Sequence, residues 1–194
     1  MDKSNQDYAL ELLLLIRHDI SKQNELKNFE EYDKDLEKIH LENAEKLRII
    51  ITKIGWPTIR KVGYEANKAA MMILHNAISC PKLYYEALPL LIELANKKEI
   101  ASLEAAIIYD RICYFEMRPQ KYGTQFDYDH NEELNPWEIE DYPKVDVYRN
   151  QVGLPPLDEA IKKIRTMEQK KPLNTNKERI KARHEWAKTV GWIQ

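Results

Sequence analysis

The sequence has no long hydrophobic run, and this absence excludes a membrane-spanning protein. The longest apolar run near the start covers residues 12–16, whereas a transmembrane helix needs about 20 residues. Glu11 adjoins this run and no basic segment precedes it, so the sequence does not predict a secretory signal peptide. We therefore expect a cytoplasmic protein with no membrane partner.

Strong charge and recognisable cofactor or metal motifs are absent too. Thirty basic and 32 acidic residues give a net charge of −2, which favours neither nucleic acid nor an anionic membrane as a partner. The sequence contains no HExxH, paired CxxC, P-loop, GxSxG or GxGxxG pattern, so we expect no metal and no cofactor. The two cysteines, Cys80 and Cys113, fit no spacing of metal ligands. We interpret both as core thiols, although a disulfide between them remains open.

What is present is a helical pattern in a chain long enough for a sizeable core. Of the 194 residues, 43% are hydrophobic and 32% are charged, as in a globular protein. Apolar spacing predicts helices over residues 6–20, 24–54, 63–79, 81–97, 103–116 and 157–169, and a short helix that ends at Gly153. After Pro119, alternating residues from Tyr122 to Tyr128 predict a strand, and residues 136–140 are its expected return strand.

The predicted fold class is therefore mainly α: a single-domain multi-helix bundle with a small β-hairpin following the fifth helix. We expect one domain over residues 1–169, with the hairpin around residues 120–140. Residues 170–194 form a charged C-terminal segment that is expected to be partly helical.

Two charged residues interrupt the apolar pattern of the fifth predicted helix. Asp110 shares a face with Leu103 and Tyr114, and Arg111 also has apolar neighbours three and four positions away. A helix that is apolar nearly all round usually lies in the interior, where a charge is costly unless it is paired and hydrogen-bonded. Since adjacent helical residues point in different directions, each charge is expected to need its own partner from elsewhere.

Candidate partners occur on other predicted elements. His75 lies on the edge of the alanine-rich face of the third helix, and Arg149 lies on the short helix; Gln120, Tyr122, Thr124 and Gln125 follow the fifth helix directly. One interpretation is a polar pocket walled by the third and fifth helices and covered by the hairpin. The other is that Asp110 and Arg111 are structural and only tie the hairpin down.

Five segments occur in an order that resembles a known family. They are IGWPTIRKVG (54–63), LHNAISCP (74–81), YDRI (109–112), PQKYGTQF (119–126) and VDVYRNQVGLPPL (145–157). The set resembles a bacterial domain family of unknown function with the ordered pattern GWP…VG, QHA, DR, QxYGTQ and VDxxR…GLxPL, over roughly residues 10–165. Leu74 and Asn76 stand where that family has Gln and Ala, and its N-terminal DQ pair is Asp19–Ile20 here.

The resemblance implies a shared fold and a shared polar set, without a known activity. The set comprises His75, Asp110, Arg111, Gln120, Tyr122, Gly123, Thr124, Gln125, Asp146 and Arg149. In the first hypothesis it forms a small-ligand or catalytic pocket, with His75 as a general base oriented by Asp110. Arg111 and Arg149 would then hold an anionic small molecule, with Gln120, Tyr122, Thr124 and Gln125 as further binding residues.

The second hypothesis is a non-catalytic domain for protein–protein interaction. The long helix predicted over residues 24–54 and the charged C-terminal segment would supply the partner surface. The network of Asp, Arg and Gln residues would then be purely structural.

Overall fold

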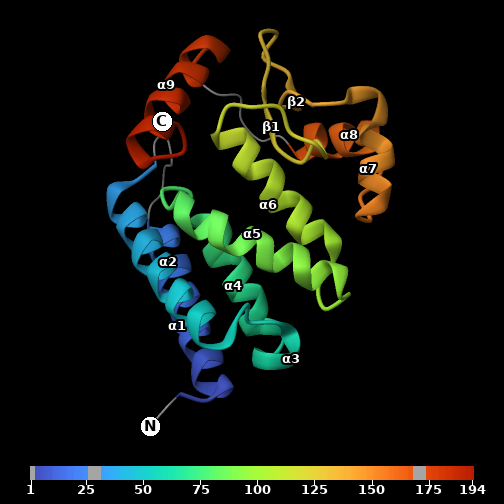
Figure 1. Ribbon diagram of the computed structural model, residues 1–194. Helices are drawn as coiled ribbons and strands as arrows, with labels where there is room; N and C mark the ends of the chain where they lie inside the picture. Colours follow the sequence, from blue (N-terminus) through green and yellow to red (C-terminus); the bar gives the residue numbers. More distant parts are fainter. Residues whose placement is uncertain (1–2, 26–31, 168–173) are drawn as a thin grey trace. The chain divides into compact units, whose positions relative to one another are not determined.

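The computed structural model describes residues 3–25, 32–167 and 174–194, and these are mainly helical (Figure 1). The helices are α1 (Asn5–Glu25), α2 (Lys34–Ile54), α3 (Ile59–Val62), α4 (Tyr64–Asn76), α5 (Pro81–Asn96), α6 (Ser102–Phe115), α7 (Val145–Gln151), α8 (Leu157–Met167) and α9 (Asn176–Val190), with a 3-10 helix η1 (Tyr142–Lys144). An antiparallel hairpin of β1 (Phe126–Tyr128) and β2 (Leu134–Pro136) follows α6. The predicted mainly α class with a small hairpin is confirmed. Within the described ranges, no helix is long and apolar enough to cross a membrane.

The chain divides into two compact units, residues 1–93 and 94–194. The predicted boundary between a domain over residues 1–169 and a C-terminal segment stays a prediction. The described part of that segment contains α9, which is helical from Asn176 to Val190.

In the first unit, α1, α2 and α4 pack against one another. Leu12 of α1, Leu47 of α2 and Ile73 of α4 are almost completely buried, and burial of each such side chain contributes roughly 2 kcal/mol. Small residues let α4 approach its neighbours closely, because Ala69 and Ala70 lie on its buried face. These contacts make the three helices the frame of the first unit.

Local sequence signals explain where α2 begins and ends. The Asp33 carboxylate accepts the N–H groups of Asp35 and Leu36 and so caps the first turn. Gly55, at a φ of 68°, ends the helix, as the GWP sequence predicts. The helix predicted over residues 24–54 is therefore shorter than expected, and residues 26–31 of that prediction lie outside the described residues.

In the second unit, the hairpin is shorter than predicted. β1 pairs with Leu134–Pro136, so the return strand lies earlier than the predicted residues 136–140. Residues 137–140 instead run beside the loop that follows Pro119. The Trp137 N–H donates to the Gln125 carbonyl and the Gln120 N–H donates to the Glu138 carbonyl, each at 2.8 Å. These bonds hold the loop after α6 against residues 137–140, which follow the hairpin.

Both cysteines are free thiols. Cys113 is buried on α6, and burial raises the pKa of its thiol to about 12. The Arg118 guanidinium donates to its sulfur at 2.8 Å. Because a thiol with so high a pKa stays protonated at neutral pH, Cys113 is a packing residue rather than a nucleophile.

Candidate functional site

The buried carboxylate of Asp110 organises the loop that follows α6. Oδ1 accepts the N–H groups of Lys121 and Tyr122 at 2.9 and 3.0 Å. Oδ2 accepts both the N–H and the hydroxyl of Thr124 at 2.9 Å. Burial raises the pKa of the Asp110 carboxyl, and these hydrogen bonds oppose the rise. The expectation that Asp110 is buried and takes its partners from outside its own helix is confirmed.

Arg149 of α7 holds the carbonyl groups of the same loop. Its Nη1 donates to the carbonyls of Tyr122 and Gly123 at 2.6 and 3.2 Å, and its Nε donates to the Pro155 carbonyl at 2.7 Å. The side chain is 2% exposed, and burial lowers the pKa of its guanidinium. Asp110 and Arg149 thus bind the N–H and C=O groups of one short segment from opposite sides.

Gly123 is required by this close approach. Its φ is 64°, in the left-handed region, and a Cβ there would lie 2.9 Å from the Leu157 side chain. Gln120 completes the loop: its amide nitrogen donates to the carbonyls of Gln125 and Trp137, and its amide oxygen accepts the Gln125 N–H. The loop is therefore held by the hydrogen bonds of Gln120 and by the buried charges of Asp110 and Arg149.

The structure thus brings together Asp110, Gln120, Tyr122, Thr124, Gln125 and Arg149 of the predicted site. Asp146 lies beside them and accepts the Leu157 N–H at 2.8 Å. Arg111 is half-buried and its guanidinium lies 5.7 Å from the centroid of the Phe115 ring. Among the described residues, its Nε has no hydrogen-bond partner. Arg111 therefore does not take part in the contacts that bind the loop.

His75 lies in the last turn of α4, in the first unit. Its backbone carbonyl accepts the Tyr84 hydroxyl at 3.1 Å. Since His75 and the loop belong to different units, their predicted convergence stays a prediction. The next residue, Asn76, contributes to a second polar cluster that the sequence analysis did not identify.

This second cluster, the Asp19 cluster, joins α1, α2 and α4 and comprises Asp19, Gln23, Tyr32, His40 and Asn76. Asp19 is fully buried, and its Oδ1 lies 3.2 Å from Nε2 of His40. The other imidazole nitrogen, Nδ1, lies 2.5 Å from the Tyr32 hydroxyl. Asn76 donates to Oδ2 of Asp19 at 3.0 Å, and Gln23 donates to Oδ1 at 2.7 Å. The carboxylate is thus surrounded by three side-chain donors.

The electrostatics fix the direction of the hydrogen bonds in the Asp19 cluster. Burial opposes ionisation of Asp19, but the bonds from His40, Asn76 and Gln23 outweigh it and hold the pKa of the carboxyl below its ordinary value. An ionised carboxylate can only accept, so Nε2 of His40 donates to Asp19, and in the neutral tautomer that carries this hydrogen Nδ1 is the acceptor. Burial, with the nearby Glu37 and Asp19 charges, raises the pKa of Tyr32. The phenol therefore stays protonated and donates to Nδ1.

The Tyr32 end of the cluster is the more accessible one. Tyr32 is half-buried, whereas His40 is 5% exposed. Beside Tyr32, the Ser79 hydroxyl donates to the Glu37 carboxylate at 2.5 Å. A molecule that reaches this cluster would meet the phenol, a serine hydroxyl and an acidic side chain.

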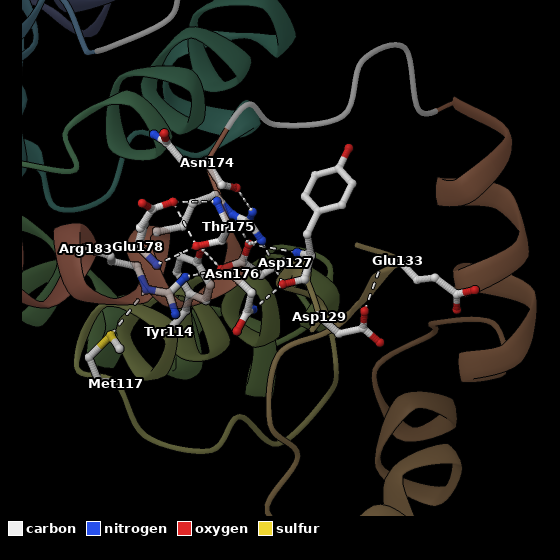
Figure 2. Close-up of polar contacts among 12 residues, drawn as sticks. Tyr114, Met117, Asp127, Asp129, Glu133, Asn174, Thr175, Asn176, Glu178 and Arg183 are labelled. Atoms are coloured by element: carbon white, nitrogen blue, oxygen red, sulfur yellow. Dashed lines mark hydrogen bonds and ion pairs between the residues drawn. The ribbon is translucent and has the colours of Figure 1, made fainter. Parts of the chain in front are cut away.

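A third polar cluster attaches α9 to the hairpin (Figure 2). The Asp127 carboxylate on β1 lies 2.5 Å from Nη1 of Arg183 and 3.5 Å from Nε of Arg179. The Arg183 guanidinium also lies 3.9 Å from the centroid of the Tyr114 ring and 4.3 Å from that of Trp137. Such stacking stabilises a desolvated cation, so we interpret this cluster as a structural contact that holds α9 on the hairpin.

Comparison with known proteins places the chain in a family. Residues 10–173 match the model of a family of unknown function, DUF6624. The chain belongs to the DUF6624 family. No curated protein and no solved structure matches it. The resemblance to a domain family of unknown function is thereby confirmed, whereas a bacterial origin stays a prediction.

The match to DUF6624 includes both the loop around Asp110 and the Asp19 cluster, and it ends before α9 begins. In the described part of this DUF6624 chain, no three His, Cys, Asp or Glu side chains come close enough to hold a metal ion.

The sequence pattern of this DUF6624 chain did not predict the Asp19 cluster. A weak signal was present: Asp19 follows Leu12 and Ile16 at helical spacing, which puts a carboxylate on the buried face of α1. His40 likewise lies four residues after Leu36 and seven before Leu47, both of which are buried. A charge on an apolar helical face needs a partner, and here that partner lies on the next helix.

Proposed function

We propose that the Asp19 cluster is an acid–base catalytic site in which Tyr32 is the nucleophile, His40 is the general base and Asp19 orients the base. The observation that carries the proposal is the engagement of both imidazole nitrogens, one by a phenol and one by a buried carboxylate. An activated nucleophile needs a base within hydrogen-bonding distance and a third group that fixes the base.

The pKa shifts are compatible with these roles. Because the pKa of Tyr32 is raised, the phenol does not ionise by itself at neutral pH and needs a base at the moment of attack. The Asp19 carboxylate, whose pKa is lowered, remains charged and stabilises the imidazolium that then forms. Asn76 and Gln23 hold the carboxylate in place.

The proposed reaction is acyl transfer to Tyr32, followed by hydrolysis. The phenolic oxygen forms a bond to the acyl carbon of an ester, and the phenolic proton passes to Nδ1 of His40. The bond between the acyl carbon and the alcohol oxygen then breaks, and the imidazolium gives its proton to that oxygen. Water hydrolyses the tyrosyl ester, which releases the carboxylic acid and restores the phenol. The Glu37 carboxylate beside Tyr32 disfavours an anionic ester, so the substrate class is a neutral or cationic one.

The contacts lend less support to the predicted anion pocket around Asp110, which stays a prediction. Asp110, Gln120 and Arg149 already have partners inside the loop, and this favours the alternative in which their network is structural. The interaction-domain alternative, with its partner surface on the helix predicted over residues 24–54 and on the charged C-terminal segment, also stays a prediction.

The test is the reactivity of Tyr32 toward an aryl sulfonyl fluoride, which modifies nucleophilic phenols. Modification of each tyrosine is measured by peptide mass spectrometry. Tyr64, which is 63% exposed, serves as an internal reference. We expect Tyr32 to react about tenfold faster than Tyr64 despite its burial, because a positioned base assists proton removal.

Variants distinguish activation of Tyr32 by His40 from simple accessibility of Tyr32 to the reagent. His40→Gln and Asp19→Asn should lower the rate at Tyr32 to that of Tyr64 or below, while circular dichroism confirms the fold. His18→Gln, on the exposed face of α1, is the matched control and should change nothing. Reaction of Tyr32 no faster than Tyr64 in the unmodified chain, or an equal rate in folded His40→Gln, would contradict the proposal.

A further inference from the structure

The third polar cluster contains a cage around one cationic side chain. The Tyr114 and Trp137 rings stand at an interplanar angle of 85°, with their centroids 5.7 Å apart. The Arg183 guanidinium lies over both rings, and the Asp127 carboxylate lies 2.5 Å from its Nη1 and supplies the opposite charge. We call Tyr114, Met117, Asp127 and Trp137 the cation cage.

Met117 forms a further side of the cation cage (Figure 2). Its sulfur accepts the Nε–H of Arg183 at 3.2 Å. The φ of Met117 is 58°, in the left-handed region that favours glycine where a helix ends. The chain therefore carries a side chain at a position where glycine would be less strained, and this side chain contacts the enclosed cation.

The cation cage has the chemistry that recognises a guanidinium. Aromatic faces attract a cation, and a carboxylate accepts its N–H groups in charge-assisted hydrogen bonds. Burial raises the pKa of the Tyr114 phenol to about 12, so the phenol stays protonated and donates to Oδ2 of Asp127 at 3.3 Å. The phenol thus also orients the carboxylate that meets the cation.

The cation cage and its occupant lie in different parts of the chain. The match to the DUF6624 family ends at residue 173, so it includes the four cage residues and excludes Arg183. Within α9, all of which the structure describes, only Ala187 is buried. The family domain therefore supplies the cage, and a segment beyond the matched range fills it.

The enclosed guanidinium does not make every hydrogen bond that it could. Its side chain is 10% exposed, and in the described part of the chain its Nη2 is buried with no hydrogen-bond partner. A buried donor without an acceptor weakens an interaction. A second guanidinium can therefore compete with Arg183 for the cation cage.

We propose that the cation cage is a binding site for an arginine side chain of a partner protein, and that Arg183 occupies it as an intramolecular competitor. The partner's guanidinium displaces Arg183 from between Tyr114 and Trp137 and pairs with Asp127. Because Asp127 then no longer holds Arg183, binding of the partner releases α9 from the hairpin. This site shares no residue with the Asp19 cluster and is independent of the proposed acyl transfer.

Binding of a short arginine peptide to the full chain tests the proposal. The probe is a peptide with one arginine between glycines and blocked ends, and the matched peptide carries citrulline, which is neutral and of similar shape. Isothermal titration calorimetry should show saturable binding of the arginine peptide to Arg183→Ala, in which the cage is vacant. Binding to the unmodified chain should be about tenfold weaker or more, because the tethered Arg183 competes. The citrulline peptide should bind neither protein.

A second pair of variants assigns this binding to the cation cage. Adding Asp127→Asn to Arg183→Ala should abolish binding of the arginine peptide, while circular dichroism confirms the fold. Glu133→Gln removes an exposed carboxylate next to β2 and is the matched control, which should leave binding unchanged. No binding to folded Arg183→Ala, equal binding of the citrulline peptide, or undiminished binding after Asp127→Asn would overturn the proposal.

Amide hydrogen exchange of the unmodified chain tests the release of α9 without any substitution. The arginine peptide at saturating concentration should raise the exchange of residues 176–190, because α9 loses the contact of Arg183 with Asp127. The citrulline peptide should have no such effect. Exchange of α9 that stays the same with bound arginine peptide would contradict the competition between Arg183 and the partner.

Discussion

The substitution Asp110→Asn tests how much one buried carboxylate stabilises the loop after α6. The change keeps the shape of the side chain and replaces one acceptor oxygen by an NH2 group. If Oδ1 is retained, Lys121 and Tyr122 keep their acceptor, but the Thr124 N–H then faces a second donor. The Thr124 hydroxyl can rotate and accept, whereas the backbone N–H cannot.

The expected loss of stability follows from these changes. A buried donor without an acceptor costs about 1–3 kcal/mol, and the two remaining bonds weaken because their acceptor is no longer charged. The free energy of unfolding should therefore fall by about 2–4 kcal/mol. Asp110→Ala, which removes the acceptor for all four donors, should cost more.

Two measurements check this result. Urea unfolding followed by circular dichroism gives the change in free energy. Amide hydrogen exchange assigns it to the loop even if the two units unfold separately, because the amides of Lys121, Tyr122 and Thr124 should exchange faster. Asp158→Asn, at an exposed site on α8, is the matched control. A change in Asp110→Asn within about 0.5 kcal/mol of zero, with unaltered exchange, would refute the reasoning.

Two further predictions concern the other polar clusters. The lowered pKa of Asp19 means that its bonds stabilise the fold above the ordinary value of 3.8, and that this contribution is lost as the pH falls through the lower pKa of the folded state. The destabilisation by Asp19→Asn, measured by urea unfolding, should therefore be larger at neutral pH than near about pH 2–3, and an effect independent of pH would exclude this account. Arg183→Met should destabilise the attachment of α9 by about 2–4 kcal/mol, because Asp127 loses its closer partner. Faster amide exchange confined to residues 176–190 would confirm it, and unchanged exchange would contradict it.

Much of the fold was accessible from local sequence signals. Gly55 and Pro81 mark real helix boundaries because their backbone preferences act within a few residues. The start of α2 was missed, since the cap at Asp33 lies in a charged stretch where several acids offer the same signal. The return strand was misplaced because Pro136 ends the pairing, and the residues after it bond to the loop instead.

The candidate sites were predictable only in part. Asp110 was identified because a charge inside an apolar helix needs a partner. That Arg149 donates to backbone carbonyls of the loop depends on how α7 folds back onto the loop, which no local pattern encodes. The Asp19 cluster joins residues far apart in sequence, and α2 has so many polar residues that periodicity alone did not single out His40.

The peptide groups between Lys121 and Thr124 lie between an anion and a cation, and this gives the segment an electrical polarity. Their hydrogen atoms face the Asp110 carboxylate, and the oxygens of Tyr122 and Gly123 face the Arg149 guanidinium. Exchanging the two side chains would conserve net charge and ion content, yet every peptide dipole would then point the wrong way. Asp110 and Arg149 are therefore not interchangeable. The direction of the backbone between them depends on the carboxylate being on α6 and the guanidinium on α7.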